Sequence, residues 1–365
     1  MSNAYLTIRL PFNVCCREAR LLLSTARLFR LAVLRLHDIV LQESPRISSE
    51  IYLKKAYRKR LWDLLPNRRY VDGAITLLYS VYESAQVLGV PLNEIEFRDW
   101  LLFQQSEREY PCKNIKMYGD FSFDVKVVNF QRGVDVISLK PTVSKRHREL
   151  LSKVLELREP YVARVKLNRF GARKGELWVH GEIQVSVRYR FYTEHFSKVN
   201  VNRGKLYAGV DVNVDRINLA IVDDDGRLRD TYTFWFEEAS RKGCSRHRAR
   251  SIIGMRVHEM LSYAYHQGVK ILFLENPEVL GKLKLLWVRS GDRGHENYNY
   301  RVSVFRSSVI EMIALKAPLY GIEVKYVDPK GTTSSREHCD VMRKYRLDRH
   351  VASAYLIALK GLERP

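Results

Sequence analysis

The order of apolar segments in residues 201–365 restricts the possible folds more than any other feature of the chain. Three strand-like runs come first, and they are "KLYAGVDVN", "INLAIVD" and "LRDTYTFWF". Two further runs, "VKILFLE" and "IEVKYVD", alternate with helical segments expected around residues 240–267, 302–320 and 348–362. Three consecutive strands followed by strands that alternate with helices predict a mixed sheet with both faces covered.

Two carboxylates are predicted to meet in this sheet. Asp211 lies between Val210 and Val212 in a run that otherwise has the pattern of a buried strand, and Glu275 ends the apolar run "ILFLE". The order of elements is that of an RNase H-like fold, in which the first strand pairs in parallel with the fourth. Asp211 and Glu275 would then be neighbours, at the carboxyl edge where α/β sheets bind ligands.

Two carboxylates held in a poorly solvated site need positive charge beside them. They repel each other and favour protonation unless a divalent cation neutralises them. Mg²⁺, or Mn²⁺ in its place, suits oxygen ligands together with waters and phosphate. Two such ions activate water and stabilise the leaving oxygen in phosphodiester hydrolysis. The alternative is structural: Asp211 bonds to Asn213 or to backbone, and Glu275 caps the following turn.

Three motifs carry a resemblance to a known family. They are "GVDVNVDRINLAIVD", "ILFLENPEVLG", and "GIEVKYVDPKGTTSS" leading to "LDRHVASAYLIALKGL". In order and spacing, residues 205–362 resemble the RuvC-type nuclease half of the TnpB/OrfB proteins of bacterial and archaeal insertion sequences, which are relatives of the type V CRISPR nucleases. The resemblance implies an RNA-guided DNA endonuclease that uses Mg²⁺ and is encoded by elements associated with transposition and DNA recombination.

The third motif offers two candidates for the last site residue. The family usually has Asp-x-Asn-small-Ala here, and alignment on Ser353 and Ala354 puts His350 at the Asp position. Asp348 lies two residues earlier, so on a helix the two side chains diverge by about 200° unless Asp348 is the N-cap. Oxygen suits Mg²⁺ better than imidazole nitrogen, which favours Asp348 as the third ligand. In the alternative, Asp348 is an ordinary cap and His350 a partly buried polar residue. The predicted catalytic residues are Asp211, Glu275, Asp348 and His350, and the predicted metal ligands are the first three.

The four-cysteine zinc ribbon common in this family is not recognisable here. Relatives place it after a Thr-Ser pair, which this chain keeps at residues 333–334, but only two candidate ligands follow before the third motif. A structural zinc site needs four ligands, and the others would have to come from a distant helix. We therefore expect no zinc. The candidates are His338, Cys339, Cys244 and His247.

The part of the chain before residue 201 is predicted to contain a strand, a helical region and a small β-barrel. Residues 1–14 would give the first strand, residues 15–105 the helical region and residues 106–200 the barrel, followed by the RuvC-like domain at 201–365. Alternation in "IQVSVRYRF" predicts a half-buried antiparallel strand, and "LNRFGARKGELWV" a hairpin loop before it. The overall expectation is an α/β chain, with a C-terminal RNase H-like (RuvC-type) mixed sheet preceded by the barrel and its inserted helices. Only the order of these regions resembles the wedge and recognition regions of the family.

The charge of the chain indicates a polyanionic partner. The formal net charge is +21, from 62 Lys+Arg against 41 Asp+Glu, which is far more than solubility requires. DNA and a guide RNA are the expected partners. We expect no membrane span, because apolar stretches such as "LFRLAVLRL" are broken by arginine and fall short of the roughly 20 residues needed. The N-terminus lacks the apolar core of a signal peptide, so we expect a cytoplasmic protein; the sequence does not indicate its oligomeric state.

Three functions remain open at this point. The first is a Mg²⁺-dependent, RNA-guided DNA endonuclease, which Asp211 and Glu275 favour. The second is a protein that binds guide RNA or DNA through a decayed nuclease domain, favoured by the absent ribbon and the irregular third motif. The third is an RNA-independent RuvC-like resolvase acting as a dimer, which leaves the long N-terminal half unexplained.

Overall fold

The computed structural model describes the chain except for residues 1–4, 44–46, 48, 88, 130–132, 174, 197–203, 242, 277–285, 291–295, 329–334 and 364–365. The chain divides into two compact units. The N-terminal unit comprises Tyr5–Phe191 together with Leu286–Asp292, and the C-terminal unit comprises Tyr192–Leu285 and Arg293–Pro365 with Met1–Ala4. The predicted boundaries at residues 14, 105 and 200 remain predictions.

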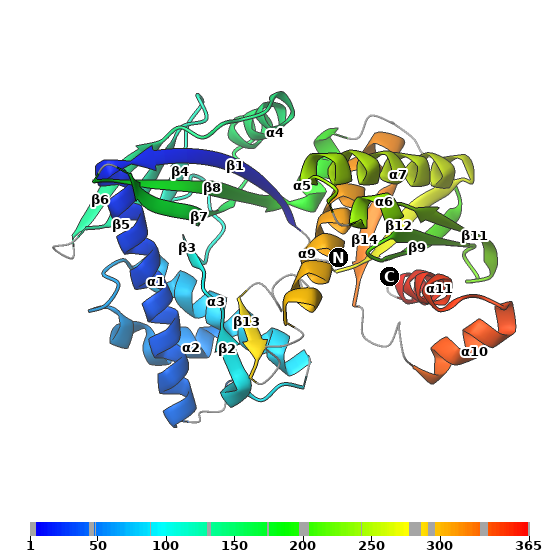
Figure 1. Cartoon of the computed structure of the whole chain (residues 1–365), viewed down its shortest axis with the longest axis horizontal. Helices are drawn as coiled ribbons and strands as arrows, with labels where there is room; N and C mark the ends of the chain where they lie inside the picture. The colour runs from blue at the N-terminus through cyan, green and yellow to red at the C-terminus, as the bar shows by residue number, and fades with distance from the viewer. Residues whose placement is uncertain are drawn as a thin grey trace. The chain divides into compact units, whose positions relative to one another are not determined.

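The N-terminal unit is built on antiparallel sheets (Figure 1). The larger sheet has the order β1-β8-β7-β3 and a smaller one the order β4-β5-β6, while β2 pairs with β13. The strands are β1 (Tyr5–Cys15), β2 (Ile95–Phe97), β3 (Leu101–Gln104), β4 (Ile115–Met117), β5 (Phe123–Val128), β6 (Val134–Leu139), β7 (Val162–Arg173), β8 (Glu176–Arg188) and β13 (Trp287–Arg289).

The predicted strand in "IQVSVRYRF" ends earlier than its alternating pattern suggests. Ile183, Val185 and Val187 are buried in β8 as expected, but the strand stops at Arg188 and the chain turns into helix α5 (Tyr189–Phe196). The hairpin loop before it is also shorter than predicted, because β7 continues to Arg173 and β8 starts at Glu176. Gly175 in this turn has φ +81°, a left-handed conformation that glycine adopts without strain.

Helices of the N-terminal unit lie mainly between β1 and β3 in sequence. The longest, α1 (Cys16–Glu43), buries a continuous apolar face that includes Leu22, Phe29 and Leu36, as its leucine spacing predicts. The other helical segments are α2 (Glu50–Tyr57), η1 (Arg58–Leu61), α3 (Arg68–Val87), η2 (Leu92–Glu94) and α4 (Lys145–Glu156).

The C-terminal unit contains the predicted five-stranded mixed sheet, in the order β11-β10-β9-β12-β14. The first three strands in sequence pair antiparallel, and β12 then pairs in parallel with both β9 and β14. This is the RNase H-like arrangement, so the predicted fold class is confirmed. The strands are β9 (Leu206–Val212), β10 (Arg216–Val222), β11 (Leu228–Trp235), β12 (Val269–Glu275) and β14 (Glu323–Val327).

Helices cover this sheet on both faces, with α7 and α11 on opposite sides in Figure 1. Helix α11 matches the predicted segment 348–362 closely, whereas α7 starts at Arg246 rather than near 240 and α9 at Glu296 rather than near 302. The helix at residues 336–345 was not predicted. The helical segments are α6 (Glu237–Ser240), α7 (Arg246–His266), α9 (Glu296–Lys316), η3 (Ala317–Tyr320), α10 (Arg336–Tyr345) and α11 (Arg349–Leu362).

Small residues bring α11 unusually close to the sheet. A Cβ atom added to Gly209 on β9 would lie 2.1 Å from the backbone oxygen of Ala354 and 2.5 Å from the backbone nitrogen of Ala358. On the helix side, Gly361 lies directly against the ring of Phe273. This packing fixes the face of the sheet on which the start of α11 is found. No helix among the described residues is both long and apolar enough to cross a membrane.

Candidate metal centre

Asp211 and Glu275 lie side by side on the α11 face of the sheet. Gly209 on β9 is the register partner of Phe273 on β12, and both contact α11. Side chains alternate along a strand, so the residues two positions further on, Asp211 and Glu275, project from the same face. They are only 2% and 3% exposed. The sequence prediction that these two carboxylates are neighbours agrees with this arrangement.

One arginine joins the two carboxylates. The Nη2 atom of Arg306, on α9, lies 3.0 Å from Oε2 of Glu275 and 3.4 Å from Oδ1 of Asp211. The same nitrogen therefore contacts both acids. A site for positive charge is thus already present between Asp211 and Glu275 in the folded chain.

The second oxygen of Asp211 has polar neighbours of its own. Asn213 donates a hydrogen bond from Nδ2 to Asp211 Oδ2 at 2.7 Å, so the bond foreseen in the structural alternative is present. His350 Nδ1 lies 3.4 Å from the same oxygen and 3.1 Å from Asn213 Nδ2. In the neutral ring Nδ1 can accept from the amide, and in the protonated ring it can donate to the carboxylate.

Asp348 and His350 have different surroundings. Asp348 is exposed and is the N-cap of α11, where its Oδ1 accepts hydrogen bonds from the backbone N–H groups of His350 at 2.8 Å and Val351 at 3.0 Å. His350 points from the first turn of α11 toward Asp211. These contacts bring His350 to the predicted site, whereas the hydrogen bonds of Asp348 are those of a helix cap. Which of them completes a metal site remains a prediction.

The donors at this site fit a hard divalent cation. The carboxylates of Asp211 and Glu275 converge on one position, and the positively charged guanidinium of Arg306 lies there. Carboxylate oxygens are the ligands that Mg²⁺ and Mn²⁺ prefer. Asn218 adds a nearby polar group: it is the register partner of Asp211 on β10 and is 1% exposed. Its Nδ2 atom has no hydrogen-bond partner among the described residues.

A second acidic cluster is explained by the turn that contains it. Asp223, Asp224 and Asp225 follow β10 and have carboxylate oxygens within 4.8 Å of one another. Burial alone would raise the pKa of Asp223, but hydrogen bonds from the backbone of Arg227 and the guanidinium of Arg229 lower that pKa below its usual range. These bonds hold the β10–β11 turn.

The candidate zinc ligands have contacts of other kinds where the structure describes them. His338 is buried, and its Nε2 lies 2.9 Å from the backbone oxygen of Arg349 and 3.2 Å from Ser353 Oγ, so it links α10 to α11. Cys339 is exposed on α10, and Cys244 contacts the backbone of Ser245. The side chain of His247 and residues 333–334 lie outside the described parts of the chain.

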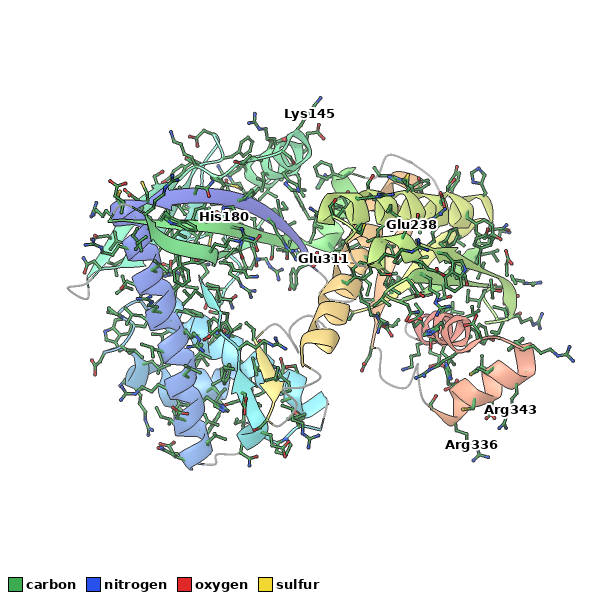
Figure 2. The ribbon with its side chains drawn as sticks, in the orientation of Figure 1. Lys145, His180, Glu238, Glu311, Arg336 and Arg343 are labelled. Atoms are coloured by element: carbon green, nitrogen blue, oxygen red, sulfur yellow. The ribbon has the colours of Figure 1, made fainter. Side chains whose placement is uncertain are left out.

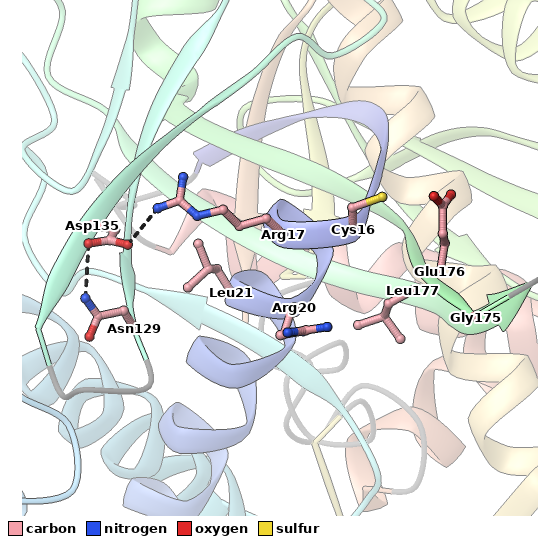
Figure 3. Close-up of a pocket in the computed structure, with 9 residues that line it drawn as sticks. All are labelled: Cys16, Arg17, Arg20, Leu21, Asn129, Asp135, Gly175, Glu176 and Leu177. Atoms are coloured by element: carbon pink, nitrogen blue, oxygen red, sulfur yellow. Dashed lines mark hydrogen bonds and ion pairs between the residues drawn. The ribbon is translucent and has the colours of Figure 1, made fainter.

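Exposed basic side chains are found in both units. Arg336 and Arg343 project from α10 in the C-terminal unit (Figure 2). In the N-terminal unit, a cavity of about 570 Å³ lies beside the start of α1 and contains Arg17 and Arg20 (Figure 3). Arg17 forms an ion pair with Asp135 at 3.1 Å. Asp135 also accepts a hydrogen bond from Asn129.

Sequence reasoning missed Arg306, although the helix pattern contained a signal for it. Val309, Ile310 and Ile313 on α9 are buried, and Arg306 precedes them by a spacing that places all four on one helix face. A charged residue on the buried face of a helix needs a partner. The buried acids of the neighbouring sheet, Asp211 and Glu275, were the available candidates.

Comparison with known proteins gives one family match and several relatives. The family described as "SSO2105 N-terminal domain" matches residues 5–197. Two uncharacterized proteins of Aeropyrum pernix are 56% and 55% identical over 99% of this chain, covering 86% and 97% of their own lengths. The uncharacterized protein SSO2105 of Saccharolobus solfataricus is 28% identical over 83% of this chain and 80% of its own length.

Solved structures give weaker similarities. A Cas12f1 complex with single-guide RNA and target DNA covers 93% of this chain and 82% of that chain at 14% identity, with a TM-score of 0.45. The Thermus thermophilus RuvC in complex with a Holliday junction covers 43% of this chain and 93% of that chain at 15% identity, with a TM-score of 0.29.

Proposed function

The chain belongs to the family of the SSO2105 N-terminal domain, and we propose that it is a divalent-metal-dependent endonuclease that cleaves DNA. The observation that carries this proposal is the convergence of Asp211 and Glu275, both almost fully buried, on one cation position at the centre of an RNase H-like sheet. Burying two adjacent carboxylates is unfavourable unless positive charge accompanies them, and a catalytic metal centre accounts for the arrangement.

In this proposal Asp211 and Glu275 bind Mg²⁺ or Mn²⁺. A metal ion held by these carboxylates would supply an activated water and would stabilise the oxygen that leaves phosphorus. Asn213 orients Asp211 through the 2.7 Å hydrogen bond to Oδ2. His350, 3.4 Å from the same oxygen, is the better supported third site residue, while the oxygen preference of Mg²⁺ supports Asp348. Zinc is not part of the proposal.

We further propose that the enzyme uses a guide RNA, as its resemblance to the TnpB/OrfB proteins implies. The net charge of +21 supports contacts with many phosphates, and the N-terminal unit would hold RNA while the C-terminal unit cleaves DNA. In this reading the chain is encoded by a transposable element and works in the cytoplasm.

One observation favours a second candidate. The contacts of Arg306 with both carboxylates give them a cation without any metal. A nucleic-acid-binding protein with a decayed nuclease site would retain such a contact as ordinary structure. An RNA-independent resolvase remains the third candidate.

Nucleic acid that copurifies with the full-length chain tests these candidates. A discrete RNA species, together with Mg²⁺-dependent cleavage of DNA that matches this RNA, supports the proposed function. A discrete RNA without cleavage under any metal condition selects the binding protein. Metal-dependent cleavage of branched DNA by RNA-free protein selects the resolvase.

A further inference from the structure

We infer that Arg306 is a displaceable counter-ion, which occupies the cation position between Asp211 and Glu275 and must leave it when a divalent metal binds. This inference rests on the proposed metal site. It adds that metal binding competes with an internal arginine, so that Arg306 sets the metal concentration at which the site is filled.

The contacts of Arg306 identify it as a substitute for a metal ion. A single nitrogen, Nη2, approaches both carboxylates, at 3.0 Å from Glu275 and 3.4 Å from Asp211. Both acids are buried, so their negative charges are poorly screened by water and require a neighbouring cation. Because Arg306 reaches across from α9, it can withdraw without any change in the strands that carry the acids.

The same contacts show that Arg306 is not held in its most favourable arrangement. A guanidinium binds carboxylate most strongly as a two-pronged fork. Here the Nε atom of Arg306 is buried without a hydrogen-bond partner among the described residues. An unsatisfied buried donor destabilises the arrangement, so a better cation can displace Arg306.

Removal of Arg306 should therefore have opposite effects on stability and on metal affinity. Without metal, Arg306→Gln leaves two buried carboxylates with less positive charge beside them, and the melting temperature should fall. With metal, the competitor is gone and the dissociation constant for Mn²⁺ should decrease by about tenfold, equivalent to about 1.4 kcal/mol. Saturating Mn²⁺ should then raise the melting temperature of Arg306→Gln more than that of the wild type.

The test measures binding of Mn²⁺ to nucleic-acid-free, full-length protein by electron paramagnetic resonance, together with melting temperatures with and without Mn²⁺. Arg256→Gln is the matched control, because Arg256 is also on a helix and forms an exposed ion pair with Glu259 at 2.7 Å. Arg256→Gln should change neither the affinity for Mn²⁺ nor the melting temperatures appreciably. Should Arg306→Gln fail to fold, Arg306→Met supplies the same loss of charge with a different side chain, and Arg306→Lys should restore the wild-type affinity.

The outcomes separate this inference from the proposed function. Tighter Mn²⁺ binding by Arg306→Gln than by the wild type supports the competition. Equal or weaker binding by Arg306→Gln, with binding lost in Asp211→Asn, overturns the competition but leaves the metal site intact. Absence of specific Mn²⁺ binding in every variant overturns both the competition and the proposed function, and makes Arg306 a permanent structural partner.

Discussion

Two pairs of buried acids, one pair in each unit, are neutralised in different ways. In the N-terminal unit Glu159 is paired with Arg188 by two parallel bonds, from Nε at 2.7 Å and from Nη2 at 2.9 Å. Asp72 likewise accepts from Nε of Arg58 at 2.6 Å. In the C-terminal unit, Asp211 and Glu275 instead share one nitrogen of Arg306 at longer distances.

This difference separates structural ion pairs from a candidate reaction site. The two parallel bonds between Arg188 and Glu159 satisfy both charges. A metal ion would therefore bind Glu159 no more favourably than Arg188 does. Two carboxylates that converge on one nitrogen form a site that a divalent cation can occupy more favourably. All four acids are buried, so burial does not distinguish a candidate reaction site from a structural ion pair. The geometry of the ion pairs does distinguish them.

The largest expected effect is on cleavage by Asp211→Asn. This substitution keeps the size of the side chain but removes a metal-binding charge, so DNA cleavage should fall by at least about 10²-fold, as when one transition-state contact is lost. Binding to nucleic acid should be nearly unchanged, because affinity depends on the basic surfaces. Gel-shift and cleavage assays on the same preparation measure the two effects. Parallel losses of binding and cleavage would mean that Asp211 is structural.

The second effect concerns the close contact that holds α11 against β9. Gly209→Ala places a Cβ 2.1 Å from the backbone oxygen of Ala354, and the resulting displacement of the helix should cost roughly 3 kcal/mol of unfolding free energy. Gly119→Ala is the control, because its chain neighbours are the sole described residues with atoms within 4 Å of the added Cβ. Denaturant unfolding of both variants makes the comparison. A wild-type stability for Gly209→Ala would show that α11 can move away from the sheet at little cost.

Much of this architecture could be predicted from the sequence because it depends on local periodicity. Alternation and helical spacing located the strands and helices along the chain. Their order is that of an RNase H-like fold, and the strand pairing of that fold placed Asp211 next to Glu275. The contribution of Arg306 could not be predicted in the same way, because it is 31 residues from Glu275 and periodicity does not specify which neighbour a helix face meets.

Tertiary contacts also explain where the periodicity misled. Tyr189 and Phe191 continue the alternation of β8 but belong to α5. Within this helix Tyr192 stacks on Phe196, at a ring-centroid distance of 5.5 Å, and donates a hydrogen bond to the backbone oxygen of Leu315. Contacts with a distant segment therefore outweigh the local strand pattern.

The third effect should appear in the N-terminal unit. Glu159→Gln weakens the fork with Arg188, and because the Arg188 side chain is 55% exposed the loss of unfolding free energy should be only about 1 kcal/mol. Cleavage per folded molecule should not change. Thermal unfolding and cleavage of the same samples measure both quantities. A large loss of cleavage in Glu159→Gln would contradict the conclusion that the Glu159–Arg188 pair is structural and takes no part in the reaction.

The smallest effect tests the role of Asp348 and uses a pair of substitutions. Asparagine caps a helix about as well as aspartate, so Asp348→Asn should keep the hydrogen bonds to His350 and Val351 and leave stability nearly unchanged. Asp348→Ala removes the cap and should cost about 1 kcal/mol. If Asp348 only caps α11, cleavage by Asp348→Asn stays near the wild-type rate, whereas His350→Ala lowers it because this histidine is the neighbour of Asp211. If Asp348→Asn instead abolishes cleavage at unchanged stability, the carboxylate is the third metal ligand, as the oxygen preference of Mg²⁺ predicts from the sequence.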